Sequence, residues 1–465
     1  MTSLRFTGRL IFRGDPEFEE ARIGRVFNGR RPDRQPAAVL IAETDDDVVN
    51  GVLLARENGW PVAVRSGGHS WAAWSVRDDT LLVDLGLLRD IRFDAATGIV
   101  SARPAVKGGD ELDPFLEQHG RFFNGGHCPS VGIGGFLLQG GQGWNARGWG
   151  WAAESIVAID VVTAEGELVR ADADQNADLY WAARGSGPTF PGIVVRFHLA
   201  TRERYRYVAH TVQVFALEDF TPVMRWLYSV HNEISPEVEI VCISMTKPSV
   251  DGAPRSRQFV VTGLCLAASR ESAENALAPF RDNPLLDRAL FVKDAGESSI
   301  AEQRIEQVRM NPEHARYVVD NAWVDGDPDD IIERIRPMFT DIPTPEGFTI
   351  WFSMGPLRTL PDMAFSLQSE AYIASYLVYD DPAEDVSNRD WLNAAMERAE
   401  PVTVGQYLGD SDMGNRQLRV LGDAQYERLQ QIIARRDPDG RFVRYLATDA
   451  ATVNRNHWDA DVVRT

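Results

Sequence analysis

Residues 124–135 read Asn-Gly-Gly-His-Cys-Pro-Ser-Val-Gly-Ile-Gly-Gly, and this stretch decides how the rest of the chain is interpreted. A second run upstream, residues 64–70, reads Val-Arg-Ser-Gly-Gly-His-Ser. Each run is a glycine-dense loop with one side chain that can form a covalent bond, Cys128 in the former and His69 in the latter. Because glycine has no Cβ, such loops let backbone N–H groups approach an anion closely. The two loops together predict a large anionic cofactor that backbone amides hold and that is attached twice.

The spacing of the glycines differs from the fingerprint of nicotinamide-binding folds. Gly132, Gly134 and Gly135 give Gly-x-Gly-Gly, and residues 140–143, which end at Gly143, give Gly-Gly-x-Gly. Neither run has the preceding strand and the later acidic residue that accompany Gly-x-Gly-x-x-Gly. A Rossmann domain is therefore not expected, and tight turns in a β-rich domain are the alternative explanation for these glycines.

Composition indicates a large, acidic globular protein. A chain of 465 residues should divide into two domains, because single hydrophobic cores stop growing well below this length. The net charge of −20 at pH 7 opposes binding to nucleic acid or to anionic membranes, so the expected partner is a small molecule. Residues 1–7 lack the long apolar stretch of a signal peptide, which predicts a cytoplasmic protein.

The chain has three cysteines, too few for a disulfide framework and without a CxxC metal spacing. Cys242 and Cys265 lie in apolar, strand-like runs and are predicted to be buried free thiols. Cys128 has His127 beside it, and an imidazole with converging N–H groups would favour the thiolate. A metal site formed by His69, His127 and Cys128 is a weaker alternative, because its ligands are of mixed type and have no short spacing motif.

Apolar alternation and turn residues predict an α+β fold in two parts. The domains are expected at 1–201, at 202–400 on an antiparallel sheet, and at 401–465 as a C-terminal segment that returns to the first domain. The predicted strands are 37–42, 61–64, 81–85, 99–103, a hairpin of 156–163 and 167–171 around Gly166, and then 207–215, 257–267, 348–354 and 372–379. The predicted helices are 44–55, 109–118, 217–231, 271–280 and 426–435.

The two loops resemble those of the berberine bridge enzyme-like branch of the vanillyl-alcohol-oxidase type flavoproteins, which have an FAD-binding domain of the PCMH type. The resemblance is carried by residues 65–70 and 128–135. It continues upstream and downstream in further short segments, namely 27–29, 34–39, 161–166, 178–187, 426–429 and 437–442. It covers the first two hundred residues and the tail strongly, and the middle of the chain weakly.

This resemblance implies FAD attached at two points, with His69 bonded to the 8α-methyl group and Cys128 to C6 of the flavin ring. Two bonds fix the ring relative to the substrate and tend to raise the flavin potential. Backbone amides in 65–70 and 132–135 would hold the pyrophosphate, and Ile193 and Val194 would lie beside the adenine or flavin. The implied cofactor-binding set is completed by Arg65, Ser66, Gly67, Gly68, Ser70, Val131, Gly132, Gly134, Gly135, Gly143 and Tyr407.

Oxidation of an alcohol or amine also needs a base near the carbon that loses hydride. Residues 361–365 resemble a family segment that contains an aspartate, which makes Asp362 the first candidate, although a solvated acid in a proline-containing loop is an equal alternative. Tyr372, Tyr376 and Tyr407 are further candidates, each also readable as a packed sheet aromatic. Gln406 replaces the asparagine that the family usually has before an aromatic residue.

Val131 matches the position that governs access of oxygen to the flavin in this family, and valine there resembles the oxygen-reactive members. The resemblance thus implies an FAD-dependent oxidase that removes hydride from a C–OH or C–N carbon of a sugar or an aromatic metabolite and reduces O2 to H2O2. A dehydrogenase with another electron acceptor and a flavin-binding protein without turnover are the alternatives. Five tryptophans near the loops suggest an aromatic-walled site, with core packing as the other explanation: Trp71, Trp74, Trp144, Trp149 and Trp151.

Overall fold

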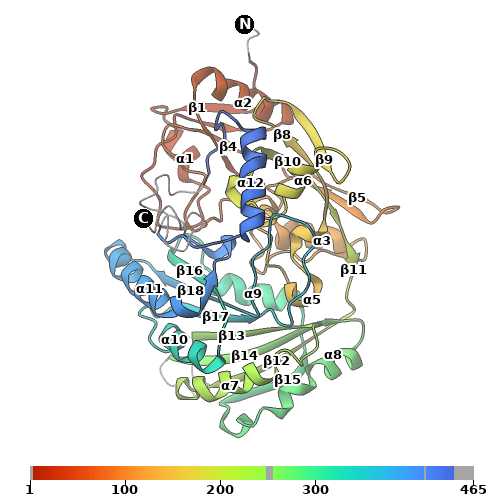
Figure 1. The fold of residues 1–465 in the computed structure, drawn as a ribbon, viewed down its shortest axis with the longest axis vertical. Coiled ribbons are helices and arrows are strands. Elements are labelled where there is room, and N and C mark those ends of the chain that lie inside the picture. Colours follow the sequence, from red (N-terminus) through yellow and green to blue (C-terminus); the bar gives the residue numbers. More distant parts are fainter. Residues whose placement is uncertain (1–3, 248–254, 413–414, 445–465) are drawn as a thin grey trace.

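The structure is a computed structural model that describes residues 4–247, 255–412 and 415–444. Two layered halves meet across a central region, with smaller sheets in the upper half of Figure 1 and one broad sheet in the lower half. Helices and antiparallel sheets are mixed along the chain, so the predicted α+β class is confirmed.

The upper half contains two main sheets. The first has the order β1 (Arg9–Phe12), β2 (Ala38–Ile41), β4 (Leu81–Asp84) and β3 (Val62–Arg65), with β4 parallel to both neighbours. The second is antiparallel, with the order β5 (Ile91–Asp94), β6 (Ile99–Ala102), β10 (Ile193–Ala200), β8 (Ile156–Val162) and β9 (Leu168–Asp172). A short ribbon of β7 (Arg121–Phe122) and β11 (Arg202–Glu203) leads down to the lower half.

The lower half is built on an antiparallel sheet of eight strands within the described residues. Their order is β15 (Phe291–Glu297), β12 (Tyr207–Phe215), β14 (Ser256–Ala267), β13 (Val238–Lys247), β17 (Phe348–Ser353), β18 (Ala371–Tyr379), β16 (Arg316–Val324) and β19 (Thr403–Gly405). Because side chains alternate along a strand, each strand presents one set to each face of the sheet.

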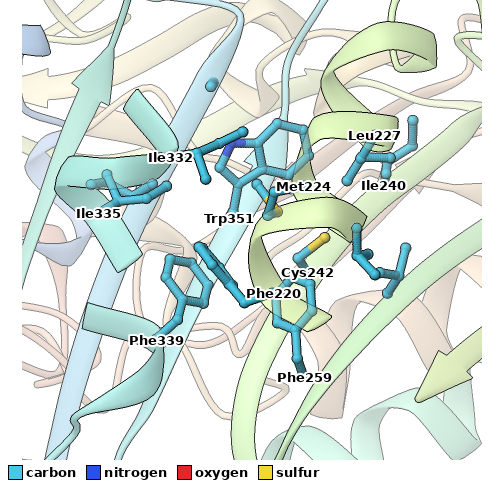
Figure 2. Packing of buried hydrophobic residues seen from close by; sticks show 14 of the residues in the cluster. Phe220, Met224, Leu227, Ile240, Cys242, Phe259, Ile332, Ile335, Phe339 and Trp351 are labelled. Atoms are coloured by element: carbon cyan, nitrogen blue, oxygen red, sulfur yellow. The ribbon is translucent and has the colours of Figure 1, made fainter. Parts of the chain in front are cut away.

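One face of this sheet is covered by helices, which Figure 1 places along the outside of the lower half. The helices that cover it are α7 (Phe220–Val230), α8 (Arg270–Leu277), α10 (Pro328–Thr340) and α11 (Asp385–Ala399). Figure 2 shows the resulting core, in which Phe220 of α7 and Phe339 of α10 pack on Cys242 and Trp351 of the sheet. Burial of each such aromatic side chain stabilises the fold by about 1.5–3 kcal/mol. The opposite face is left to meet the upper half.

The remaining helices are shorter or belong to the upper half. They are α1 (Phe18–Ile23), α2 (Asp45–Asn58), α3 (Asp113–Glu117), α4 (Ile133–Leu138), α5 (Ala146–Trp149), α6 (Ala177–Ala182), α9 (Ile300–Met310) and α12 (Asp423–Arg436). Helix α2 begins where Thr44 and Asp47 form a reciprocal capping box, and it ends at Gly59 in the left-handed region.

The end of the described chain contacts both halves. Strand β19 pairs with β16 in the lower sheet, whereas α12, dark blue in Figure 1, packs its Leu429 and Ile433 into the core of the upper half. Phe442 then pairs with Val62 at the edge of β3. The segment after residue 400 is therefore shared between the two halves, and residues 445–465 lie outside the described part.

The predicted strands and helices occur within a few residues of their expected limits, and Gly166 has a φ of 79° in the predicted turn. The helix expected over 271–280 ends at Leu277 because Pro279 lacks an N–H group and the chain continues as a 3₁₀ turn. Elements that were not predicted include strands β10, β15 and β16 and helices α9, α10 and α11. Cys242 and Cys265 are buried and free, as predicted. No helix in the described ranges has the length and apolar character needed to cross a membrane.

Candidate active site

A cavity of about 450 Å³ lies between the upper half and the uncovered face of the broad sheet. Both glycine loops border it, at residues 65–70 and 126–135. From the other side it is closed by side chains of β12, β13, β14, β17 and β18. Its size is that of a ligand pocket, and it brings together residues that are far apart in the sequence.

The two glycine loops touch each other at the wall of the cavity. A Cβ added to Gly67 would lie 2.7 Å from the backbone nitrogen of Gly132, and one added to Gly132 would lie 2.8 Å from Cα of Gly67. Gly68 has a φ of 83°, and a Cβ there would lie 1.8 Å from the carbonyl oxygen of Arg25. Glycine is therefore required at these positions for close backbone approach.

The backbone of the first loop presents a row of free donors. Among the described residues, none accepts a hydrogen bond from the backbone N–H groups of Gly67, Gly68, His69 and Ser70. The loop begins at Arg65, whose buried guanidinium pairs with Asp84 at 2.6 Å and thus fixes the end of β3. Consecutive free N–H groups at the edge of a cavity form an anion-binding concavity.

His69 and Cys128 are brought together by Ser130. The Ser130 Oγ lies 3.1 Å from Nε2 of His69 and 3.7 Å from Sγ of Cys128. The His69 ring stacks on Phe27 with centroids 4.3 Å apart. Burial lowers the pKa of His69 to about 4, and the positive charge of Lys107 adds to this effect, so the imidazole is neutral at pH 7.

The predicted thiolate at Cys128 is wrong for the protein chain by itself, because burial raises the pKa of the thiol. Hydrogen bonds from Ser130 oppose this shift but do not overcome it. His127, which was expected to favour ionisation, points away from the thiol toward Glu239. The metal alternative also fails on geometry, since His69 and His127 face different partners and no group of three possible ligands occurs in the described ranges.

A buried carboxylate that the sequence reasoning missed, Asp410, lines the cavity. The Asp410 carboxylate accepts a hydrogen bond from the Tyr372 hydroxyl at 2.8 Å and another from the Trp71 indole at 3.5 Å, and Tyr376 is a further donor. Burial raises the pKa of Asp410, although these donors and the charge of His127 oppose the shift. One feature of the sequence could have indicated Asp410, namely its position three residues after the candidate Tyr407.

A second acidic group, Glu239 on β13, also lines the cavity. Its carboxylate oxygens lie 3.0 and 3.1 Å from Nε2 of His127, and one of them accepts the backbone N–H of Asn145 at 2.7 Å. No sequence pattern connects these residues, because 112 positions separate His127 from Glu239. The pair links the second glycine loop to the broad sheet.

The predicted cofactor-binding residues are gathered around this cavity with one exception. The lining includes His69, Cys128, Arg65, Ser66, Gly67, Gly68, Ser70, Val131, Gly132, Gly134, Gly135, Ile193, Val194 and Tyr407. Gly143 lies behind the wall, where a Cβ would meet the carbonyl oxygen of Asn124 at 1.8 Å.

The predicted catalytic residues are divided. Val131 and Tyr407 line the cavity, and Tyr372 reaches it through Asp410. Asp362 lies outside, largely exposed and bound to Arg428 and the Trp181 indole. Gln406 is buried behind the wall, where its amide joins Asp320 to the backbone of Leu418.

The five tryptophans also separate into two groups. Trp71, Trp74 and Trp144 line the cavity. Trp151 packs with Trp323 and Phe365 in a buried cluster, and Trp149 packs against Phe122. Some of the five tryptophans therefore form an aromatic wall of the cavity, and the others pack in the interior of the protein.

The donors of this cavity fit an FAD molecule. The free N–H groups of residues 67–70 suit a pyrophosphate, and His69 and Cys128 offer a neutral imidazole and a thiol within reach of one hydroxyl group. The apolar lining from Ile193, Val194 and Trp71 suits the faces of flat rings.

The sequence of residues 36–172 matches the family described as FAD binding domain. The chain is 37% identical over 431 residues to the FAD-linked oxidoreductase janO of Penicillium janthinellum, which covers 92% of this chain and 94% of that protein. It is 38% identical over 177 residues, or 38% of this chain and 35% of the relative, to xylooligosaccharide oxidase of Thermothelomyces thermophilus. The solved structure of Physcomitrella patens BBE-like 1 superimposes with a TM-score of 0.81 at 21% identity, covering 94% of this chain and 96% of that one.

Proposed function

Because the chain belongs to the FAD-linked oxidoreductases that share the berberine bridge enzyme-like fold, we propose that it is an oxidase whose FAD is bonded to both His69 and Cys128. The observation that carries this proposal is the placement of both side chains on one hydroxyl group, Ser130 Oγ, at the wall of one cavity. When bound, FAD supplies the hydride acceptor and returns the electrons to O2, which becomes H2O2. The substrate is a small molecule that carries a C–OH or C–N group.

The protonation state of His69 supports its proposed role in the covalent attachment of FAD. A neutral imidazole has a lone pair available for bonding, and the low pKa keeps it neutral across the physiological range. Since Nε2 is engaged by Ser130, Nδ1 is the ring nitrogen left to form the bond. Cys128 must lose its proton to bond, and the Ser130 hydroxyl is the nearest group that can take part in that transfer.

We assign the role of catalytic base to Asp410, in place of Asp362. Asp410 lines the cavity and is held by Tyr372 and Trp71, whereas Asp362 is exposed and outside it. As hydride leaves the substrate carbon, a proton must leave the attached oxygen or nitrogen. Asp410 accepts it, either directly or through the hydroxyl of Tyr376, which also lines the cavity.

Val131 supports an oxidase over a dehydrogenase. Its side chain lines the cavity three residues from Cys128, and valine would take up less space beside an attached ring than a larger side chain, which favours access of O2. We further propose that residues 1–201 and α12 hold FAD while residues 202–400 bind the substrate. The match of residues 36–172 to an FAD-binding family and the packing of α12 in the upper core support this division.

Two measurements test the proposal. After acid precipitation the flavin should stay with the protein, and mass spectrometry of peptides should place it on His69 and Cys128. His69→Ala and Cys128→Ala should each retain one bond, and release of free FAD from the unmutated protein would contradict the double attachment.

The activity is tested by anaerobic addition of alcohols and amines, followed by admission of air. Bleaching of the flavin and its recovery with one equivalent of H2O2 are expected. Recovery only with an artificial acceptor would instead identify a dehydrogenase. A flavin that dithionite reduces but no substrate in the panel reduces would identify a binding protein without turnover.

A further inference from the structure

The face of the broad sheet that closes the cavity is apolar across four strands. The strand registers align Val260, Ile243 and Ile350 in one row across β14, β13 and β17. The next row contains Val212, Thr262, Val241 and Phe352. All seven of these side chains line the cavity, and Met245, Leu264 and Phe348 extend the surface.

The polar side chains within this surface are already bonded inside the protein. The Thr262 hydroxyl donates to the carbonyl oxygen of Val241 at 3.1 Å. The Glu239 carboxylate is held by His127 and by the backbone of Asn145. His210 at the edge contacts the Gln303 amide at 3.3 Å. The face therefore offers a ligand mainly hydrocarbon contact, because the Thr262 hydroxyl within it already donates to the backbone and the other polar groups lie at its margins.

The residues at the edges of the cavity are more polar than the sheet face that closes it. Asp410 and Tyr376 border the cavity, and so do Gln303, Glu306 and Gln307 of α9 and Asn311 directly after that helix. A ligand on the sheet thus meets hydrogen-bonding groups at the edges of the apolar surface.

We propose that the substrate has an extended, neutral, apolar skeleton, of the fused-ring or terpenoid kind, that lies on the Val260–Ile243–Ile350 row and presents one oxidisable group to Asp410. This inference rests on the proposed oxidase function and narrows its substrate class. An oligosaccharide has hydroxyl groups on every ring, and burying them on this face without partners costs free energy that an apolar skeleton avoids. The site thus disfavours oligosaccharides, whose hydroxyl groups would find no hydrogen-bond partners on this face. It favours hydrocarbon skeletons, which gain free energy from the apolar surface that they bury.

The test is a binding measurement on the flavin-loaded protein that does not depend on turnover. Testosterone and borneol serve as apolar probes, each with one secondary hydroxyl group, and cellobiose and xylobiose serve as sugar probes. Binding is followed anaerobically by the change in the flavin absorption spectrum. We expect half-saturation by the apolar probes at concentrations at least about 10-fold lower than by the sugars.

Two variants locate the binding surface, the isosteric Val260→Thr and the slightly smaller Ile243→Thr. Ile243→Thr and Val260→Thr each place a hydroxyl group on the row and should weaken binding of the apolar probes by about 10-fold. Val386→Thr, at a position on α11 that is 56% exposed and outside the cavity, is the matched control and should leave binding unchanged.

Each outcome is decisive for the substrate class. The proposed substrate class would be overturned if the sugars bound more tightly than the apolar probes. It would also be overturned if neither apolar probe changed the flavin spectrum, or if the three variants had equal effects on binding. A sugar that reduces the flavin would overturn the substrate class but leave the proposed oxidase intact. If no alcohol or amine reduced a competent flavin while the apolar probes still bound, the proposed oxidase activity would be contradicted. The proposed binding surface would then still stand.

Discussion

Nε2 of His69 lies 3.1 Å from the hydroxyl oxygen of Ser130. The same oxygen is 3.7 Å from Sγ of Cys128, so one side chain orients both residues proposed to bond FAD. A partner on one ring nitrogen fixes the tautomer and the orientation of an imidazole, and so decides which nitrogen is free to react.

We therefore expect Ser130→Ala to slow formation of both flavin bonds by roughly 10²- to 10⁴-fold, the range in which loss of a proton-transfer partner falls. Flavin fluorescence in denaturing gels and peptide mass spectrometry, followed over time after FAD is added to flavin-free protein, give the two rates. Ser130→Thr keeps the hydroxyl group and should restore them. Equal rates for Ser130→Ala and the unmutated protein would remove Ser130 from the attachment chemistry.

Asp410→Asn should lower kcat by roughly 10²- to 10⁴-fold while the flavin remains attached, because the carboxylate that accepts the proton is lost. The matched control is Asp362→Asn, which changes an exposed carboxylate outside the cavity and should leave kcat nearly unchanged. The opposite ranking of the two variants would return the role of base to Asp362.

The same base predicts a pH dependence. A carboxylate accepts protons only when ionised, so kcat/KM should fall as the pH is lowered through the pKa of Asp410. Burial raises that pKa, which places the fall above the ordinary carboxyl range near pH 4. A pH profile that stays flat down to pH 4 in the unmutated enzyme would show that another group accepts the proton.

Arg147 is predicted to be a major determinant of stability. Its buried guanidinium donates to the carbonyl oxygens of His231, Ile234, Ser235, Val238 and Gly355, and thus joins α5 to the lower half. Arg147→Met leaves these carbonyls without a charged donor and should cost about 3 kcal/mol in unfolding free energy. Arg225→Met removes an exposed, solvent-screened ion pair with Asp329 and should cost much less. Denaturant unfolding of both variants measures the difference.

His231 predicts a loss of stability in mild acid. Burial lowers its pKa to about 4, whereas the unfolded chain titrates near pH 6.5. Between these values only the unfolded chain binds the proton, so the free energy of unfolding falls as the pH falls, by about 2 kcal/mol at pH 4.5. His231→Gln should reduce this dependence, whereas His314→Gln, at an exposed position, should retain it. Urea unfolding at a series of pH values distinguishes them.

Gly135 and Gly67 test the cofactor cradle in different ways. A Cβ on Gly135 meets no protein atom within 4 Å, and this residue lines the cavity. Gly135→Ala should thus fold normally and lose FAD only by occupying space that the cofactor needs. Gly67→Ala pushes against Gly132 and should reduce both stability and FAD content. Flavin content and thermal midpoints of the two proteins give the comparison.

Local sequence patterns were sufficient to predict most of the strands and helices that border the site. Thr44 and Asp47 specify the start of α2 through a capping box, and Gly59 specifies its end, because these are contacts between residues a few positions apart. Strand β16 was missed, since Arg316–Val324 is buried on both faces of the sheet and lacks the alternation of a half-exposed strand.

The α+β class, the two glycine loops and the reactive residues His69 and Cys128 could be predicted from local patterns, because glycine spacing and residue chemistry are local properties. Which acids face the cavity depends on packing between segments that are far apart in the chain. Asp362 and Asp410 are both acidic residues in loops, and packing turns the first toward Arg428 in solvent and the second toward Tyr372 and Trp71. The ionisation of Cys128 was decided in the same way, since burial depends on the whole fold and outweighs the neighbours that the sequence shows.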